Sequence, residues 1–230
     1  MIKADNNFHI GKCCLMVILM IVLTSCDTFT SRARILDEII DLNPETGEIY
    51  YYGHPWETWE TLDLDQATTM IETLDTRDGV RLYEYEGDQR LKWSHRTFNT
   101  AESLFLDNSG APILLNVSFN PSNANPHFSQ IIGKLGEPDR AGIGTTYGST
   151  AVEILYKFPD HIAVFRFSTT RVGSNIMSCQ TTNVVSLSSY RLVRVASFEE
   201  LEAYDRIPAV SSNMWFDNFE IDGEDIRVCR

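Results

Sequence analysis

The sequence predicts an α+β fold in which an antiparallel sheet carries helices on one face. Segments whose apolar residues recur every three or four positions alternate with segments in which they recur every second position, as expected for helices and strands. The strand-like segments occur as neighbouring pairs around short turns, which is typical of antiparallel hairpins. Two blocks of a helix followed by hairpins suggest two similar helix-plus-hairpin halves, at residues 49–120 and 127–230.

The first half has clear start and stop signals. Residues 31–42 have helical spacing and end at Asn43-Pro44, and residues 63–76 form a second amphipathic segment behind Asp63 or Asp65 as a cap. Residues 80–86 and 89–94 flank Gly87-Asp88, and residues 103–107 and 113–119 flank a second turn that contains Gly110. These pairs predict two hairpins.

The polar stretch 120–126 separates the halves, and the pattern then restarts. Residues 127–135 predict a helix that ends at Gly136, with Pro138 beyond it. Residues 151–158 and 162–168 predict a hairpin, and residues 184–195 a further strand. Ser197 and Glu200 have the spacing of a capping box at the start of a short helix.

Composition limits the class of protein. The chain has 230 residues, 43% of them hydrophobic, and a formal net charge of −13. A chain of this length and composition can bury a core. Its negative charge argues against nucleic acid as a partner, because binding to phosphates needs a concentrated basic surface.

The N-terminal segment has the features of an export signal. Lys3 and Lys12 precede an uncharged apolar run that ends at Leu23. The run is shorter than the ~20 apolar residues that a membrane-spanning helix needs. The following Leu23-Thr24-Ser25-Cys26 resembles the lipobox of bacterial lipoproteins. An ordinary secretory signal with a chance cysteine is the alternative.

The lipoprotein resemblance implies a domain organisation. Residues 1–25 would be the signal peptide, residues 26–48 the lipidated N-terminus, tether and short helix, and residues 49–230 the globular domain. Lipid on Cys26 would anchor the chain to the cell membrane or outer membrane, facing the periplasm or the exterior. Two or more acyl chains make such attachment stable.

Two cysteines would remain in the mature chain besides Cys26. They are Cys179 and Cys229, and an oxidising compartment favours a disulfide between them, although some bacteria keep exported thiols reduced. Two cysteines alone cannot supply the four ligands typical of a structural zinc site.

A second, partial resemblance covers residues 127–168. A helix that ends in Leu135-Gly136-Glu137-Pro138, followed by the hairpin around residues 159–161, is similar to the small lipoproteins of outer-membrane β-barrel assembly and to the related β-lactamase-inhibitor-protein fold. The resemblance implies an antiparallel sheet behind that helix. Leu-Gly-x-Pro is also a common helix stop.

No motif of catalysis, cofactor binding or metal binding is present in the sequence. His54, His95, His127 and His161 fall in four separate segments, so any metal site or catalytic triad would depend on tertiary convergence. We therefore predict no catalytic, cofactor or metal residues and no cofactor.

The densest group of aromatic residues lies between residues 50 and 59. Its glycine and proline predict a loop, and Tyr51, Trp56 and Trp59 are the candidate binding residues, because exposed rings can stack on sugars or anchor a protein interface. The alternative is that these rings pack in the core.

These observations together predict a lipid-anchored extracytoplasmic protein that binds an envelope protein or glycan and has no catalytic activity. The alternative is a cell-envelope hydrolase whose active site is not visible in the sequence. An enzyme would show a pocket with convergent acids or histidines, whereas a binding module would show an exposed aromatic or apolar patch.

The lipid anchor gives the first testable prediction. Cys26→Ala removes the only lipid acceptor in the lipobox, so the precursor should stay unprocessed and should not take up labelled fatty acid. Both are read from a gel of metabolically labelled cells. Normal processing and labelling of this variant would contradict the lipoprotein assignment.

Overall fold

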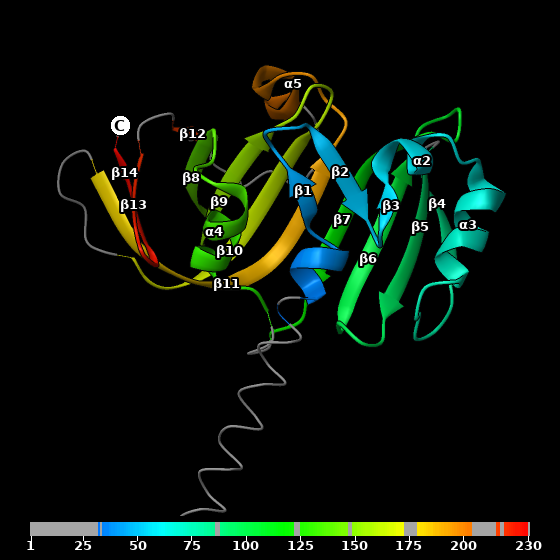
Figure 1. The fold of residues 1–230 in the computed structure, drawn as a ribbon, viewed down its shortest axis with the longest axis horizontal. Coiled ribbons are helices and arrows are strands. Elements are labelled where there is room, and N and C mark those ends of the chain that lie inside the picture. Colours follow the sequence, from blue (N-terminus) through cyan, green and yellow to red (C-terminus); the bar gives the residue numbers. More distant parts are fainter. Residues whose placement is uncertain are drawn as a thin grey trace, which may run out of the picture.

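The computed structural model describes residue 32 and residues 34–85, 88–121, 125–146, 149–172, 179–203, 215–216 and 219–229. Within these residues one antiparallel sheet of eleven strands dominates the molecule (Figure 1). A second sheet has only three short strands, β1 (Asp41–Asn43), β2 (Glu48–Tyr51) and β3 (His54–Pro55).

The large sheet consists of two sequential meanders that meet edge to edge. The first contains β4 (Arg81–Tyr85), β5 (Asp88–His95), β6 (Thr100–Leu106) and β7 (Pro112–Phe119). The second contains β8 (Arg140–Thr146), β9 (Ser149–Lys157), β10 (Ile162–Val172) and β11 (Cys179–Val193). They join because β7 pairs with β11 in antiparallel register.

Short strands and helices complete the described fold. At the far edge β12 (Trp215–Phe216) pairs with β8. The strand β14 (Asp225–Cys229) pairs with β11 on one side and with β13 (Phe219–Asp222) on the other. The helices are α2 (Trp56–Glu60), α3 (Leu64–Glu72), α4 (Phe128–Leu135) and α5 (Phe198–Glu202), and residues 34–38 are also helical.

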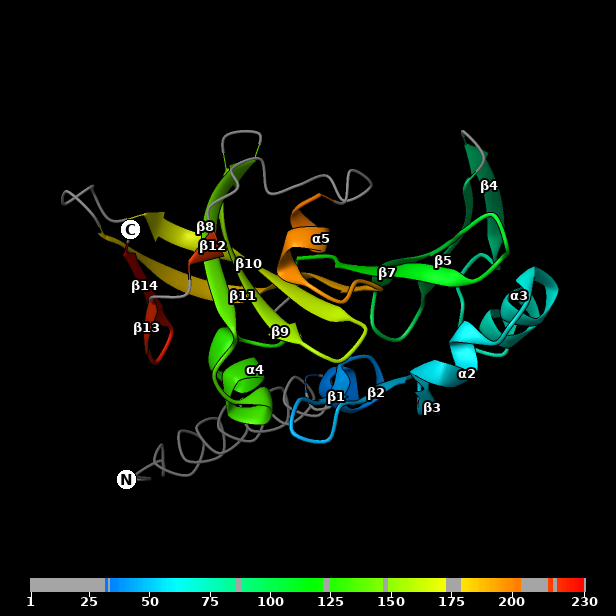
Figure 2. The ribbon, with the colours of Figure 1, turned by 90° about the horizontal axis from the view of Figure 1, so that it is seen from above.

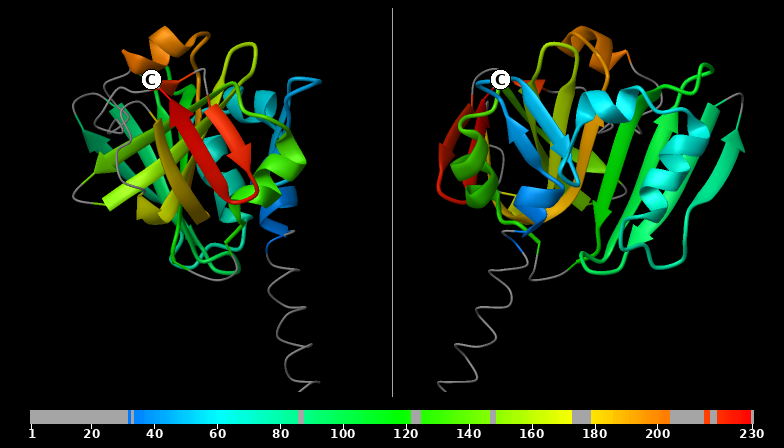
Figure 3. Two further views of the ribbon diagram at one scale, coloured as in Figure 1. Left: turned by 90° about the vertical axis from the view of Figure 1, so that its left-hand side faces the viewer. Right: turned by 45° about the vertical axis from the view of Figure 1, so that its right-hand side comes forward.

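The large sheet is curved, and its two faces have different neighbours. Figure 2 shows α5 on the inner side of the curve and β1, β2, α3 and α4 on the outer side. In the right-hand view of Figure 3, the N-terminal strands and α2 and α3 lie in front of the sheet. The main core therefore lies on the outer side, between the sheet and the N-terminal elements.

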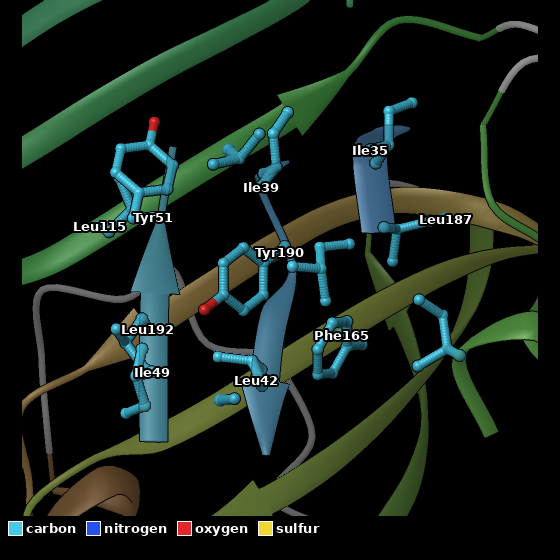
Figure 4. Packing of buried hydrophobic residues seen from close by; sticks show 14 of the residues in the cluster. Ile35, Ile39, Leu42, Ile49, Tyr51, Leu115, Phe165, Leu187, Tyr190 and Leu192 are labelled. Carbon is cyan, nitrogen blue, oxygen red and sulfur yellow. The ribbon is translucent and has the colours of Figure 1, made fainter. Parts of the chain in front are cut away.

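Alternate residues of each strand point into this core. Leu115, Phe165, Tyr190 and Leu192 of the large sheet are buried together with apolar residues of the N-terminal segment (Figure 4). That segment contributes Ile35, Ile39, Leu42 and Ile49, all buried. Full burial of one such side chain stabilises the fold by about 1.5–3 kcal/mol, so the N-terminal segment is part of the domain rather than a tether alone.

The expected fold class is wrong. The four labelled helices have only five, nine, eight and five residues, and the small sheet occupies much of the outer side where helices were expected. The fold is mostly β. The two halves are not separate units in the structure, because four strands from each half form one continuous sheet. Sequence periodicity identifies strands but does not show which distant strands pair.

Several local predictions are confirmed. Asp63 caps α3 and forms a capping box with Gln66, and α4 ends at Gly136, whose φ of 79° suits glycine. The pairs β4–β5, β6–β7 and β9–β10 form the predicted hairpins. The helix expected over residues 31–42 is shorter, because the chain turns into β1 at Asp41.

The predicted signal peptide and Cys26 lie outside the described residues. Among the helices that are described, none has the length and apolar character to cross a membrane.

The two predicted disulfide partners lie on adjacent strands. The register of β11 with β14 places Cys179 directly opposite Cys229. Opposite residues of antiparallel strands have Cα atoms about 4.5–5.5 Å apart, which lies within the range that a disulfide spans. The bond itself stays a prediction.

A buried carboxyl group connects the two sheets. Glu102 of β6 is 2% exposed. Its carboxyl group accepts hydrogen bonds from the hydroxyl groups of Tyr51, Tyr52 and Thr100, and the Tyr52 hydroxyl oxygen lies 2.7 Å from Oε1. Burial raises the pKa of Glu102, and these hydrogen bonds oppose the rise. The same burial and the nearby carboxylate raise the pKa of both tyrosines.

The raised pKa gives a prediction about stability. Because the folded protein holds the Glu102 proton more tightly than the unfolded chain, the free energy of unfolding should fall as pH rises above the ordinary glutamate value of 4.5. Glu102→Gln removes this titration. The stability of the variant relative to wild type should therefore increase between pH 4.5 and about pH 7, as measured by urea unfolding.

Glu57→Gln is the matched control, because Glu57 is exposed on α2. The control should follow the wild type at each pH. An equal pH dependence for wild type and Glu102→Gln would show that the buried carboxyl titrates normally.

Candidate functional site

The inner face of the large sheet carries the side chains that alternate with the core positions. The strand register aligns them in rows that run across the strands. One row is Arg81, Lys92, Ser103, Asn116, Arg191, Val164, Leu155 and Arg140. The adjacent row is Ser94, Ala101, Ser118, Ser189, Arg166 and Glu153. A face of this kind is polar over most of its area.

Helix α5 covers the apolar part of the inner face. Leu201 of α5 packs in a cluster with Leu114, Ile162, Val164 and Val193 from the sheet. Figure 2 shows no labelled helix over the inner face of β4 and β5, which lie beyond the region that α5 covers.

A hollow of about 320 Å³ lies over β4–β7. We call it the inner groove, and its lining includes Asp78, Arg81, Tyr83, Arg90, Lys92, Ser94, Ala101, Ser103, Asn116 and Ser118. Its volume lies within the ~300–1,000 Å³ typical of sites for small ligands. Its floor consists of small and hydroxyl-bearing side chains, and its cations come from β4 and β5.

Arg90 is the most constrained cation of the groove. Its Nη2 donates to the Ser103 hydroxyl at 2.9 Å, and its guanidinium lies over the Phe105 ring at 4.3 Å. Its Nε is buried and has no hydrogen-bond acceptor. Burial lowers the pKa of Arg90, yet a guanidinium stays charged at any physiological pH.

The other two cations are also without an acidic partner. The Lys92 ammonium lies over the Tyr83 ring, 4.5 Å from its centre, and Arg81 is exposed. In the part of the chain that the structure describes, none of Arg81, Arg90 and Lys92 forms an ion pair. Asp78 lines one end of the groove without an ion pair to any of the three. The groove therefore holds three positive charges without a counter-charge in bonding distance.

Charges nearer the middle of the sheet are compensated. The Arg166 Nη1 lies 3.5 Å from Oε1 of Glu153, which is 1% exposed, and the Arg191 Nε donates to Oδ1 of Asn116 at 3.2 Å. Burial raises the pKa of Glu153, and Arg191 and Arg166 oppose the rise. Among the described residues of this face, Arg166 thus has a carboxylate partner, whereas Arg81, Arg90 and Lys92 have none.

A second polar cluster lies at the β9–β10 turn. The Trp56 Nε1 donates to Nε2 of His161 at 2.9 Å, and the same nitrogen lies 3.0 Å from Oε1 of Glu60. Arg194 Nε is 3.6 Å from that oxygen. Burial lowers the pKa of His161, although Glu60 opposes this. Since Trp56 occupies its Nε2 and His161 is buried, this cluster attaches α2 to the turn.

The predicted aromatic binding residues are not at the surface. Tyr51, Trp56 and Trp59 are 1%, 2% and 0% exposed. Trp59 Nε1 donates to the backbone carbonyl of Tyr51 at 3.2 Å, so each polar tip has a partner inside the protein. The expectation of an exposed loop is wrong because Tyr52 and Gly53, with φ of 50° and 73°, make a tight hairpin turn between β2 and β3.

The four histidines are not brought together at a site. His54 is exposed, His95 stacks on Tyr52, and His127 lies at the start of α4. Within the described ranges, no group of three or more potential metal ligands occurs.

Sequence reasoning predicted the β4–β5 hairpin but missed its role in the groove. Alternate residues of a strand lie on the same face. The sequence pattern therefore places Arg81 and Tyr83 of β4 on one face, and Arg90 and Lys92 of β5 on one face. Three cations and an aromatic ring on one face of a hairpin are a signal that could have been found in an acidic chain. What the sequence does not show is that Ser103, Asn116 and Ser118 complete the floor.

Comparison with known proteins adds no relative to this description. No protein-family model, curated protein or solved structure matches the chain, so the resemblances noted in the sequence receive no support from such a match.

Proposed function

We propose that this protein is a lipid-anchored binding protein of the cell envelope and that the inner groove is its ligand site. The anchor rests on the lipobox that ends at Cys26. The ligand site rests on one observation, which is that Arg81, Arg90 and Lys92 line a hollow and have no carboxylate partner within the described chain.

Two of these charges, on Arg90 and Lys92, are partly buried and costly for the fold alone, whereas Arg81 is exposed. A partly buried cation without a counter-charge loses hydration and gains little in return. A ligand with negative charge would supply the missing counter-charge, and this favours a role for the three cations in recognition.

Binding fits the groove better than catalysis does. Hydrolysis would need a base next to a nucleophile or a pair of convergent acids. The lining contains two acids, Asp78 and Glu102, but the Glu102 carboxyl group is engaged by the hydroxyl groups of Tyr51 and Tyr52. The nearest acid–base pair, Glu60 with His161, is buried elsewhere and is engaged by Trp56. The hydrolase alternative therefore has no support from the groove.

The position of the N-terminal residues supports access to the groove from outside. Residues 34–38 lie on the outer side of the sheet, opposite the face that carries α5 (Figure 2). The eight residues from Cys26 to Arg34 can reach at most about 30 Å. If lipid on Cys26 attaches the protein to a membrane, the outer side of the sheet would lie nearer to that membrane. The groove would then point away from the membrane, toward other components of the envelope.

A photo-crosslinking residue in place of Ala101 tests this proposal in intact cells. Ala101 is exposed on the floor of the groove, so the residue there should form an adduct with an envelope component. The matched control is the same residue in place of Thr69, which is exposed on α3 on the outer side. The adduct should be lost when Arg90 and Lys92 are both changed to Gln. Adducts at position 69 and none at position 101 would contradict the inner groove as the binding site.

A further inference from the structure

We infer that the ligand of the inner groove is an acidic saccharide, that is, a sugar chain whose residues carry carboxylate groups. The inference rests on the proposed function, because it names the ligand class of that same site. Three properties of the groove support it: its charge, its floor and its rim.

The charge of the groove is opposite to that of the chain. The protein carries a net charge of −13, yet the groove holds Arg81, Arg90 and Lys92 without a carboxylate partner in the described chain. A guanidinium matches the two oxygens of a carboxylate, and an ammonium adds a point charge. The Ser103 hydroxyl and the Phe105 ring hold the Arg90 guanidinium in place at the groove.

The floor of the groove is made of groups that both donate and accept hydrogen bonds. Ser94 lies on β5, Ser103 on β6, and Asn116 and Ser118 on β7. Neighbouring strands are ~4.8 Å apart, so these groups form a regular polar surface across three strands. Sugar hydroxyl groups also donate and accept, and can pair with the partly exposed Ser94, Asn116 and Ser118, whereas Ser103 is buried and bonded to Arg90. Ala101 between these side chains leaves room for a flat ligand.

The rim offers one exposed ring. Tyr83 on the edge strand β4 is 43% exposed, and its ring borders the groove beside Lys92. A flat aromatic ring can pack on the apolar face of a sugar while its hydroxyl group stays in water. Lys92 lies over one face of the Tyr83 ring, as Arg90 lies over Phe105, so a sugar would contact the part of the Tyr83 ring that stays exposed.

An acidic polypeptide fits this lining less well. The centre of a protein interface is usually an apolar or aromatic anchor in a dry pocket. The described lining of the inner groove has its only exposed ring at the rim, and its centre is formed by hydroxyl and amide groups. Charge alone would attract both ligands, so the test must separate them.

Calorimetric titration of the full-length protein in detergent provides this test. The probes are oligogalacturonate, its methyl ester, which has the same sugars without the charge, and polyglutamate, which has the charge without the sugars. Oligogalacturonate should bind most tightly, and the methyl ester roughly tenfold or more weakly. Raising the salt from about 50 mM to about 500 mM should weaken the binding of oligogalacturonate.

Two variants place the binding in the groove. Arg90→Gln and Lys92→Gln should each weaken oligogalacturonate binding roughly tenfold. Lys157→Gln is the matched control, because it removes one positive charge from an exposed residue of β9 outside the groove and should leave binding unchanged. Urea unfolding of each variant checks that it is folded.

Four results would overturn the inference. They are equal or tighter binding of polyglutamate, equal binding of the methyl ester, equal losses for Lys157→Gln and the groove variants, and no binding of oligogalacturonate at low salt. If the last result occurs while the residue at position 101 still forms its adduct in cells, the saccharide class fails and the binding site stands. If neither is seen, the proposed function fails as well.

Discussion

The pairing of β7 with β11 is the constraint on which both faces of the large sheet depend. These strands are distant in sequence, yet their register joins the two meanders into one curved surface. It places Leu115 opposite Leu192 on the outer face, and Asn116 opposite Arg191 on the inner face. A slip of one residue would exchange the faces, putting Arg191 into the apolar core and Leu192 into the polar row. The core therefore fixes the register, and the register assembles the groove.

The inner face shows a gradient of charge compensation. Glu153 lies 3.5 Å from Arg166, and both Arg166 and Arg191 act on its carboxyl group, so positive charge in the middle of the sheet faces a buried acid. Arg81, Arg90 and Lys92 lie nearer to β4, and among the described residues they form no ion pair. The same face pairs Arg166 with Glu153 a few strands away. The unpaired set is the basis of the proposed ligand site, and stability is often given up at binding sites in this way.

Local structure was predictable from the sequence, whereas the assembly was not. Short-range signals identified α3 through its Asp63 cap, α4 through Gly136, and three hairpins through their turns. The segment from Tyr51 to Trp59 was misjudged because its glycine and proline resemble a loop, although they form a tight turn that buries the rings. Glu102 and the inner groove could not be foreseen, because each combines residues from strands whose pairing no local pattern encodes. An acidic net charge also concealed a basic groove.

The central claim is that the cations of the inner groove serve a ligand and not the fold, and one comparison of unfolding free energies tests it most directly. Arg90→Met removes a charge that has no carboxylate partner, but also the hydrogen bond to Ser103 and the contact with Phe105, so the unfolding free energy without ligand should change by less than about 1 kcal/mol. Arg166→Met removes the ion-pair partner of the buried Glu153 and should cost about 3 kcal/mol. A loss of similar size for Arg90→Met would show that the fold itself needs this charge, and would contradict the account.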